Sequence, residues 1–326
     1  MTANGVSQEE MTMLSTIEGY GRWKTLDRYD PENRYIPDSN KLKTGVICLP
    51  PIKKRARSLT LKIYAVTTED GKNLLIRTDR ISRFDEECRL AALTDRVFNE
   101  AGVYTSSPME VGAFNDDTMV YSMYNFFSGE NLAARLPEFY VPEQLALGVE
   151  AGKQLKKFHT ITPAEDDEVN QPEDMFVLIT RLAEKGVKYQ GFSQAADFLK
   201  KHHYIIEKRP VTALHGDFSA NTLFLDGDLN VGMAPLQSVE WGDPITDLVT
   251  LPDGYSLPFI KGVYKGLFDG APPKDFFELL ALYSTVKALR DIDTALTEED
   301  TAAAIIRAQK IAAEYDNYQS IIPSWY

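Results

Sequence analysis

The order in which residue patterns follow one another is the feature that most limits what this chain can fold into. Four segments of alternating or β-branched apolar residues predict antiparallel strands, at 44–49, 59–67, 73–78 and 118–124. Apolar residues recur at helical spacing in six segments, at 84–100, 142–159, 173–186, 193–207, 274–291 and 297–315. Strands come first and helices afterwards, which predicts an α+β class with two lobes.

We place the boundary between the two predicted lobes after residue 125. Residues 1–125 would form the N-terminal lobe, because the small antiparallel sheet and its single helix lie there. The first forty residues are polar and aromatic with little periodicity, so we expect an irregular cap ahead of the sheet. Residues 126–326 would form a mainly helical C-terminal lobe, interrupted by a strand-loop-strand block that carries Asp217.

Composition and charge favour an ordinary globular protein. Of the 326 residues, 44% are hydrophobic and 25% are charged, and no run of about 18 apolar residues occurs. The N-terminus lacks a basic segment followed by an apolar one, so we expect a cytoplasmic protein without a membrane span. A net charge of −13 argues against nucleic acid as a partner and would tolerate a cationic small molecule.

Two short blocks concentrate the candidate functional residues. HGDFSANT occupies 215–222, and GDPITDL follows at 242–248. Asp217 could be a functional carboxylate, or a turn aspartate whose side chain bonds nearby amides. Asp243 stands directly before Pro244, a combination typical of a helix start, so we expect it to cap a helix rather than bind a metal ion.

An ordered series of motifs, which covers roughly residues 59–290, resembles the aminoglycoside phosphotransferase and choline-kinase-like family. Its pieces are NLLIR at 73–77, Glu87, FSGE at 127–130, LGVEAG at 147–152, HGD at 215–217, GDP at 242–244 and the segment 262–273. The resemblance implies the two-lobed protein-kinase-like fold, with a small antiparallel N-terminal lobe and a mainly helical C-terminal lobe. It also implies transfer of the γ-phosphate of ATP or GTP to a hydroxyl of a small molecule.

The resemblance also implies roles for particular residues. Asp217 would be the catalytic base, or the carboxylate that orients the acceptor hydroxyl. Arg77 stands at the position of the lysine that contacts the nucleotide phosphates, and Glu87 at that of its helix partner. The alternative for Arg77 is an exposed residue of an edge strand. Four consecutive residues would line the adenine pocket through their backbone, although their side chains alone look like core: Met123, Tyr124, Asn125 and Phe126.

Three further residues are expected to hold the structure rather than react. In the family pattern His215 braces the catalytic loop, and Asp247 resembles a bracing residue of the same kind. His159 ends an apolar helical stripe, so we expect a packed core histidine there.

The expected magnesium ligands depart from the family pattern. The asparagine of the catalytic loop should stand five residues after Asp217, where Thr222 is found, and Asn221 lies one position early. A shift of one residue could bring Asn221 to the metal. The second ligand should be an aspartate at the end of the next strand, where Pro235 offers no side-chain oxygen. Three nearby residues are the alternatives: Gln237, Glu240 and Asp243.

Two charged segments could contact ligands or simply face solvent. The glycine-rich loop that would cover the phosphates is absent, and a basic segment at 53–57 could neutralise phosphate charge in its place. The acidic residues at 165–168, with Glu173 and Asp174, could bind an amine-bearing substrate or form a solvated linker.

Two functions remain open from the sequence. The first is a phosphotransferase that uses ATP or GTP, with Mg²⁺ in an altered arrangement, and phosphorylates an antibiotic, a choline-like amino-alcohol or a sugar. The second is a pseudokinase that keeps the fold as a binding or regulatory module. Asp217 weighs for catalysis and Pro235 weighs against it.

Overall fold

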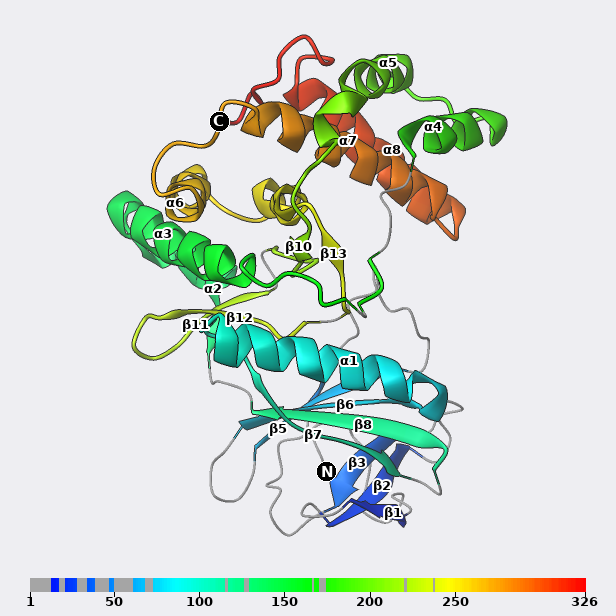
Figure 1. Ribbon diagram of the computed structural model, residues 1–326, viewed down its shortest axis with the longest axis vertical. Coiled ribbons are helices and arrows are strands. Elements are labelled where there is room, and N and C mark those ends of the chain that lie inside the picture. The colour runs from blue at the N-terminus through cyan, green and yellow to red at the C-terminus, as the bar shows by residue number, and fades with distance from the viewer. Residues whose placement is uncertain are drawn as a thin grey trace. The chain divides into compact units, whose positions relative to one another are not determined.

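Figure 1 shows the computed structural model of the chain. The structure describes residues 13–17, 21–27, 34–38, 47–49, 61–67, 73–114, 117–125, 129–165, 167–169, 174–219, 222–236 and 238–326. The chain divides into two compact units. Unit 1 contains Met1–Gly129 and Asp226–Val239, and unit 2 contains Glu130–Leu225 and Glu240–Tyr326. Neither unit is therefore one continuous piece of sequence.

Unit 1 is built around a five-stranded antiparallel sheet with the order β4-β5-β6-β8-β7. Its strands are β4 (Ile47–Leu49), β5 (Lys62–Thr67), β6 (Asn73–Arg80), β7 (Ser107–Phe114) and β8 (Met119–Asn125). Six consecutive residues of β6, at 74–79, are buried, so this strand is covered on both faces. The sequence patterns predict four of these strands and miss β7.

The helix α1 (Phe84–Asp95) lies across this sheet in Figure 1. It follows β6 through the short turn Ile81–Arg83. Its first turn carries three acidic residues, which suit the positive end of the helix dipole: Asp85, Glu86 and Glu87. Because the connection from β6 to α1 is short, Glu87 returns to a position beside the strand that it has just left.

The expected irregular cap is wrong where the structure describes this part of the chain. β1 (Met13–Ile17), β2 (Gly21–Asp27) and β3 (Arg34–Asp38) form a separate three-stranded antiparallel sheet. Each strand pairs with the next one along the chain, so pairing over short distances is enough to form the sheet. Polar residues obscure the period of two, and Pro37 breaks it within β3, an edge strand where proline is tolerated.

Unit 2 contains a pair of helices whose backbones touch, α3 (Val141–Phe158) and α6 (Leu257–Leu267). Two glycines of each helix face the other helix: Gly148 and Gly152 in α3, and Gly262 and Gly266 in α6. A Cβ atom at any of these positions would lie 2.1–2.3 Å from a carbonyl oxygen of the partner helix. Figure 1 shows the two helices side by side. The close approach therefore requires glycine at all of these positions.

The other long helices of unit 2 share an apolar core. They are α4 (Met175–Glu184), α5 (Phe192–His202), α7 (Phe276–Asp293) and α8 (Glu298–Glu314). Leu182, Leu199 and Leu289 are completely buried within it. The predicted helices agree with these bounds to within two residues, except that α5 ends early and a 3-10 turn, His203–Ile206, follows it. The mainly helical C-terminal part that the patterns predict is confirmed, but the patterns miss α6.

Short antiparallel strand pairs hold the loops of unit 2. β10 (Thr212–Ala213) pairs with β13 (Trp241–Gly242), and β9 (Glu130–Asn131) pairs with β11 (Leu223–Leu225). The HGD block leaves the end of β10, and the GDP block begins in β13 beside it. Two 3-10 turns follow β13, η6 (Pro244–Leu248) and η7 (Leu251–Asp253). Together with the sheets of unit 1, this arrangement confirms the α+β class.

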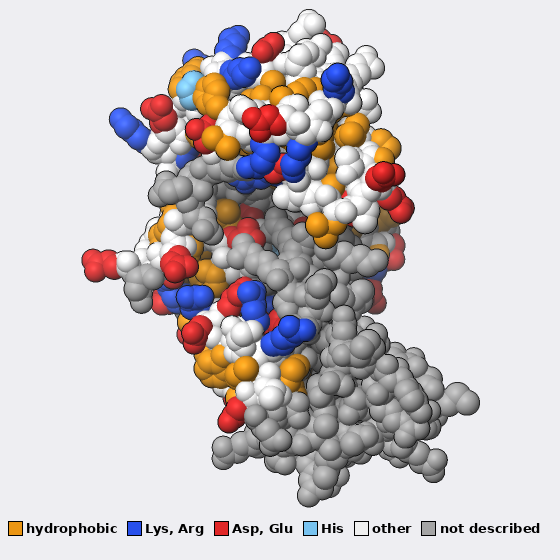
Figure 2. All heavy atoms as spheres, turned by 90° about the vertical axis from the view of Figure 1, so that its right-hand side faces the viewer, with side chains coloured by type: hydrophobic (Ala, Val, Ile, Leu, Met, Phe, Trp, Pro, Cys, Tyr) orange, Lys and Arg blue, Asp and Glu red, His pale blue; other side chains and the backbone are white. Residues whose placement is uncertain are grey.

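Two features concern the surroundings of the protein, the length of its apolar helices and the distribution of charge on one face. Among the described residues, no helix is both long enough and apolar enough to cross a bilayer. Figure 2 shows acidic and basic side chains interspersed over one face of the described residues. The net charge of −13 is thus not gathered into a single patch on that face.

Candidate active site

The HGD block lies in unit 2, where its described residues, 215–219 and Thr222, belong to a loop that we call the Asp217 loop. Its entry is fixed by backbone hydrogen bonds, since the amides of Ala213 and Leu214 donate to the carbonyl oxygens of Ile161 (2.8 Å) and Glu240 (2.9 Å). Gly216 has a φ of +76°, in the left-handed region that glycine adopts without strain. The residue that follows this turn is Asp217.

Asp247 braces the start of the Asp217 loop from η6. Its carboxylate accepts hydrogen bonds from the amides of His215 (2.9 Å) and Gly216 (2.7 Å), and it lies 2.9 Å from Nε2 of His159. Burial alone would raise the pKa of Asp247, but the hydrogen bond with His159 and the amide donors outweigh it and lower the pKa. The predicted bracing role of Asp247 is confirmed. His159 is buried as predicted, but it belongs to this polar network rather than to an apolar core.

Replacing Asp247 with asparagine is expected to destabilise the protein by about 3 kcal/mol at neutral pH. The asparagine NH₂ would face amide donors, so one buried N–H would lose its acceptor. A carboxylate with a lowered pKa stabilises the fold above its unfolded-state pKa and loses that effect as the pH falls through the folded value. Urea unfolding at pH 7 and below pH 4 should therefore show a gap between the two proteins that narrows in acid. An equal gap at both pH values would contradict this account.

Asp243 is occupied by structural contacts, as predicted. Its carboxylate caps η6 by accepting from the amide of Ile245 at 3.0 Å. It also accepts from Arg209 Nε at 2.5 Å and from the Tyr283 hydroxyl at 2.9 Å. The expectation that Asp243 caps a helix is confirmed.

Asp217 differs from both of these aspartates. It is partly exposed, and within the described residues its carboxylate makes no hydrogen bond or ion pair. A turn aspartate would bond nearby amides, and among the described residues no such bond forms here. Within the described residues, this lack of donors distinguishes the Asp217 carboxylate from those of Asp243 and Asp247.

Thr222 closes the Asp217 loop from within. Its side chain is buried, and its hydroxyl lies 2.5 Å from the Asp217 carbonyl oxygen and 3.0 Å from that of Ser219. The Thr222 hydroxyl oxygen also accepts a hydrogen bond from the Ser219 amide at 3.1 Å. Because loop backbone already surrounds this hydroxyl, Thr222 acts as a structural brace at the position where the family pattern has a metal-binding asparagine.

In unit 1, Arg77 and Glu87 form a buried ion pair. Arg77 Nε lies 3.1 Å from Glu87 Oε2 and Nη2 lies 3.0 Å from Oε1, and the Ser122 hydroxyl donates to Oε2 at 2.6 Å. Burial would raise the pKa of Glu87, but Arg77 and Ser122 outweigh it and lower the pKa. Arg77 is only 3% exposed and lies on the inner strand β6, so the alternative of an exposed edge-strand residue is wrong.

The residues predicted to line an adenine pocket lie at the end of β8. Met123 and Tyr124 are buried, and Asn125 is exposed, with its side chain donating to Ser107 Oγ at 3.2 Å. Phe126 lies outside the described residues. The core character that their side chains suggest holds for Met123 and Tyr124.

The described residues do not assemble a magnesium site. Asn221 and Gln237 lie outside the described part of the chain, and Pro235 has no side-chain oxygen. The oxygens of Thr222 and Asp243 are occupied as described above. No group of three or more His, Cys, Asp or Glu residues among the described ones could hold a metal ion. Of the side chains considered as ligands here, only Asp217 offers a carboxylate without a hydrogen-bonding partner in the described part.

Of the two charged segments, the structure describes part of the acidic one and none of the basic one. The basic segment 53–57 lies outside the described residues, as does Glu173. In the acidic segment, Asp167 accepts from the Ala164 amide at 2.7 Å and Asp174 caps α4 by accepting from the Phe176 amide at 2.7 Å. Both carboxylates therefore serve local turns, which agrees better with a linker than with a dedicated amine site.

Comparison with known proteins connects these features. The sequence model of the phosphotransferase enzyme family matches residues 55–276, more than half of the chain. The chain belongs to the phosphotransferase enzyme family. A comparison with curated proteins finds no significant match. Within the family match lie the Arg77–Glu87 pair, the Asp217 loop and the GDP block.

Solved structures confirm the protein-kinase-like fold. A point mutant of aminoglycoside 2'-phosphotransferase-IIIa in complex with GDP is 12% identical, with a TM-score of 0.67, and the match covers 85% of this chain and 94% of that one. The amicoumacin kinase hAmiN in complex with AMP-PNP, Ca²⁺ and Ami is 12% identical, with a TM-score of 0.57 and coverage of 85% and 91%. A choline/ethanolamine kinase family protein from Mesorhizobium loti is 12% identical, with a TM-score of 0.56 and the same coverage.

Sequence reasoning missed two contacts at the sites of this family member. Ser122 of β8 is the residue paired with Arg77 of β6, and its hydroxyl donates a hydrogen bond to Glu87. A serine within the apolar strand at 118–124 was the available signal. Tyr255 donates its hydroxyl proton to the carbonyl oxygen of Ser219 in the Asp217 loop at 2.9 Å. No local pattern announces that contact, because it joins residues 36 positions apart.

Proposed function

We propose that this member of the phosphotransferase enzyme family transfers the γ-phosphate of ATP or GTP to a hydroxyl of a small molecule. One observation supports the proposal above the others. Of the three aspartates in the HGD and GDP blocks, Asp243 and Asp247 are consumed by structural hydrogen bonds, while Asp217 keeps a carboxylate that no described residue occupies. A fold that braces a loop so heavily and leaves its central carboxylate open suits a catalytic position.

In the proposed step, the Asp217 carboxylate accepts a hydrogen bond from the acceptor hydroxyl and orients its oxygen. The oxygen forms a bond to the γ-phosphorus, the bond from that phosphorus to the bridging oxygen breaks, and the nucleoside diphosphate leaves with the electron pair. The hydroxyl proton passes to Asp217. The reaction depends mainly on the position of the reactants, which a braced loop would supply.

We assign nucleotide binding to unit 1. Arg77, oriented by Glu87 and Ser122, would supply positive charge for the phosphates, and the backbone of residues 123–126 would hold the base. The GDP and AMP-PNP complexes of the similar structures support a purine nucleotide as the donor. Because the described residues do not fit a magnesium site, no step is assigned to the metal. A cytoplasmic location, where these nucleotides occur, remains part of the proposal.

An amine-bearing acceptor is the class that we favour. The similar proteins include an aminoglycoside phosphotransferase and a choline/ethanolamine kinase family protein. A net charge of −13 would attract a cationic amino-alcohol over long range.

A pseudokinase is the second candidate, and a specific observation favours it. The Thr222 hydroxyl is turned into the loop and Pro235 cannot coordinate a metal ion, so both expected ligand positions differ from the family pattern. A protein that binds a nucleotide weakly, or without metal, and performs no transfer would fit these two residues.

Titration calorimetry of ATP and GTP, each with and without Mg²⁺, followed by a transfer assay with hydroxylated amines, separates these candidates. We expect nucleotide binding in the micromolar to millimolar range typical of substrates, and transfer of radiolabelled γ-phosphate to at least one amine-bearing acceptor. Binding that persists when the metal is chelated would agree with the lack of described ligands. Nucleotide binding without transfer to any acceptor would favour the pseudokinase, and no binding under any condition would remove the phosphotransferase.

A further inference from the structure

We propose that Tyr255 is a positioning residue for the reaction, whose hydroxyl holds the Asp217 loop in the conformation that presents the Asp217 carboxylate. The expected effect of Tyr255 on catalysis rests on the proposed function. Its structural part concerns unit 2 alone, because Tyr255, the Asp217 loop and the helices that support them all belong to that unit.

The hydroxyl of Tyr255 reaches the loop from outside. It donates to the Ser219 carbonyl oxygen at 2.9 Å, two residues beyond Asp217. The Tyr255 side chain is 8% exposed, and its ring stacks on Phe259 of α6 with centroids 4.4 Å apart. A buried, stacked ring has little rotational freedom, so the hydroxyl is delivered at a fixed point.

Ser219 is the point at which two hydroxyls meet. Thr222 contacts its carbonyl oxygen and amide from within the loop, and Tyr255 contacts the same carbonyl from outside. Asp247 holds the amides at the start of the loop. Among the described residues, the loop is thus fixed before Asp217 by a carboxylate and after it by three hydroxyls, because Thr250 Oγ1 also lies 3.5 Å from the Phe218 carbonyl oxygen. Removal of the Tyr255 hydroxyl would leave the second half of the loop, among the described residues, with the internal brace from Thr222 and the longer contact from Thr250.

Tyr255 remains a proton donor at working pH. Burial raises the pKa of its hydroxyl, and the nearby charge of Asp217 raises it further. The neutral hydroxyl therefore adds no charge near the loop and holds the backbone at the Ser219 carbonyl oxygen.

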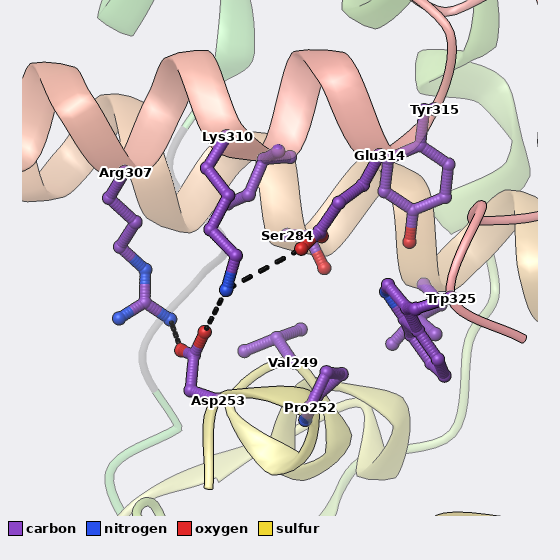
Figure 3. A pocket seen from close by; sticks show the side chains of 11 residues that line it. Val249, Pro252, Asp253, Ser284, Arg307, Lys310, Glu314, Tyr315 and Trp325 are labelled. Carbon is purple, nitrogen blue, oxygen red and sulfur yellow. Dashed lines mark hydrogen bonds and ion pairs between the residues drawn. The ribbon is translucent and has the colours of Figure 1, made fainter. Parts of the chain in front are cut away.

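The segment that carries Tyr255 is itself fastened to α8. Figure 3 shows Asp253, at the end of η7, pointing to Arg307 and Lys310. Arg307 Nη2 lies 2.5 Å and Lys310 Nζ lies 3.3 Å from the Asp253 carboxylate. The pocket beside these residues has a volume of about 20 Å³, room for one water molecule and not for a substrate. The ion pairs therefore anchor η7 and do not form a ligand site.

The test compares Tyr255→Phe with Tyr264→Phe. Both changes remove one buried hydroxyl and keep the ring. The Tyr264 hydroxyl, on α6, has no hydrogen-bond partner within the described residues, so its removal controls for the chemistry of the substitution. Two measurements are made on the full chain. Hydrogen-deuterium exchange reports the peptide that spans the Asp217 loop, and steady-state kinetics report kcat and the KM for nucleotide.

We expect Tyr255→Phe to speed exchange in the loop and to lower kcat about three- to tenfold, the effect of one lost neutral hydrogen bond. The KM for nucleotide should stay within about twofold. A general loss of structure would instead change both kcat and KM. Tyr264→Phe should change neither measurement. Equal exchange in the two variants, or faster exchange with an unchanged kcat, would overturn the proposal.

Two further outcomes are also decisive. If the wild-type protein transfers no phosphate, the proposed function fails, and loop exchange alone then decides whether Tyr255 holds the loop. If Tyr255→Phe does not fold, Asp253→Asn replaces it, since it loosens η7 and leaves the tyrosine intact. Faster loop exchange and a fall in kcat of about twofold would then support the proposal, and no change in the loop would overturn it.

Discussion

Replacement of Asp217 with asparagine is expected to lower phosphate transfer about 10²- to 10⁴-fold, the contribution usual for a positioned acid or base. Asparagine has nearly the same shape but cannot accept the proton of the acceptor hydroxyl. Stability should change by less than about 0.5 kcal/mol, because within the described residues the Asp217 carboxylate makes no hydrogen bond or ion pair that the change would break. Transfer of radiolabelled γ-phosphate and thermal unfolding together give both quantities.

Asp197→Asn is the matched control for this experiment. Asp197 is exposed on α5, and the same loss of one carboxylate there should leave transfer unchanged. A large fall in thermal stability for Asp217→Asn would assign the residue to the turn and not to catalysis. Unchanged transfer by a stable variant would remove Asp217 from the mechanism altogether.

Gly262→Ala is expected to destabilise the protein by about 3 kcal/mol or more. Helix propensity alone predicts the opposite sign, since alanine is favoured over glycine within a helix by about 1 kcal/mol. The added Cβ would however lie 2.3 Å from the carbonyl oxygen of Leu145 and 2.9 Å from the Cα of Gly148. These atoms belong to the backbone of α3, so relief requires the helices to separate. Packing therefore decides the sign.

Thermal unfolding measures this effect, which should appear as a fall in Tm of about 6–12 °C for a unit of this size. Gly227→Ala makes the same chemical change in open space, where the new Cβ would meet no atom within 4 Å, and should shift stability by less than about 1 kcal/mol. A Gly262→Ala variant as stable as the wild type would show that α3 and α6 do not pack at backbone contact.

Periodicity and local chemistry predict much of the fold. The buried stripes of α3, α7 and α8 repeat at helical spacing, and the helices follow accordingly. Asp243 could be recognised as a cap because Pro244 comes next, and that assignment needs no information beyond the two residues. The ion pair between Arg77 and Glu87 was accessible through family resemblance, which supplies a pairing that no local pattern contains.

Contacts between distant residues could not be predicted in this way. The bond from Tyr255 to Ser219 and the approach of Gly148 to Gly262 depend on how helices and loops pack, not on their local periods. The burial of Arg77 also escaped prediction, because the strand pattern alone does not say whether β6 lies inside the sheet or at its edge, whereas the order β4-β5-β6-β8-β7 places it inside. Sequence identified the open carboxylate of Asp217 only as one of two alternatives.

The division of unit 1 into two segments limits how this molecule can be cut or recombined. The stretch Asp226–Val239 belongs to unit 1 and bonds within it, since Thr105 Oγ1 donates to the Met233 carbonyl oxygen at 3.0 Å and Tyr104 donates to Asp226 at 3.0 Å. A fragment that stops at residue 129 would leave these groups on Tyr104 and Thr105 without their partners. Exchange of unit 1 between related genes would therefore have to carry Met1–Gly129 and Asp226–Val239 together. The ancestry of unit 1 should accordingly be traced with these two stretches joined.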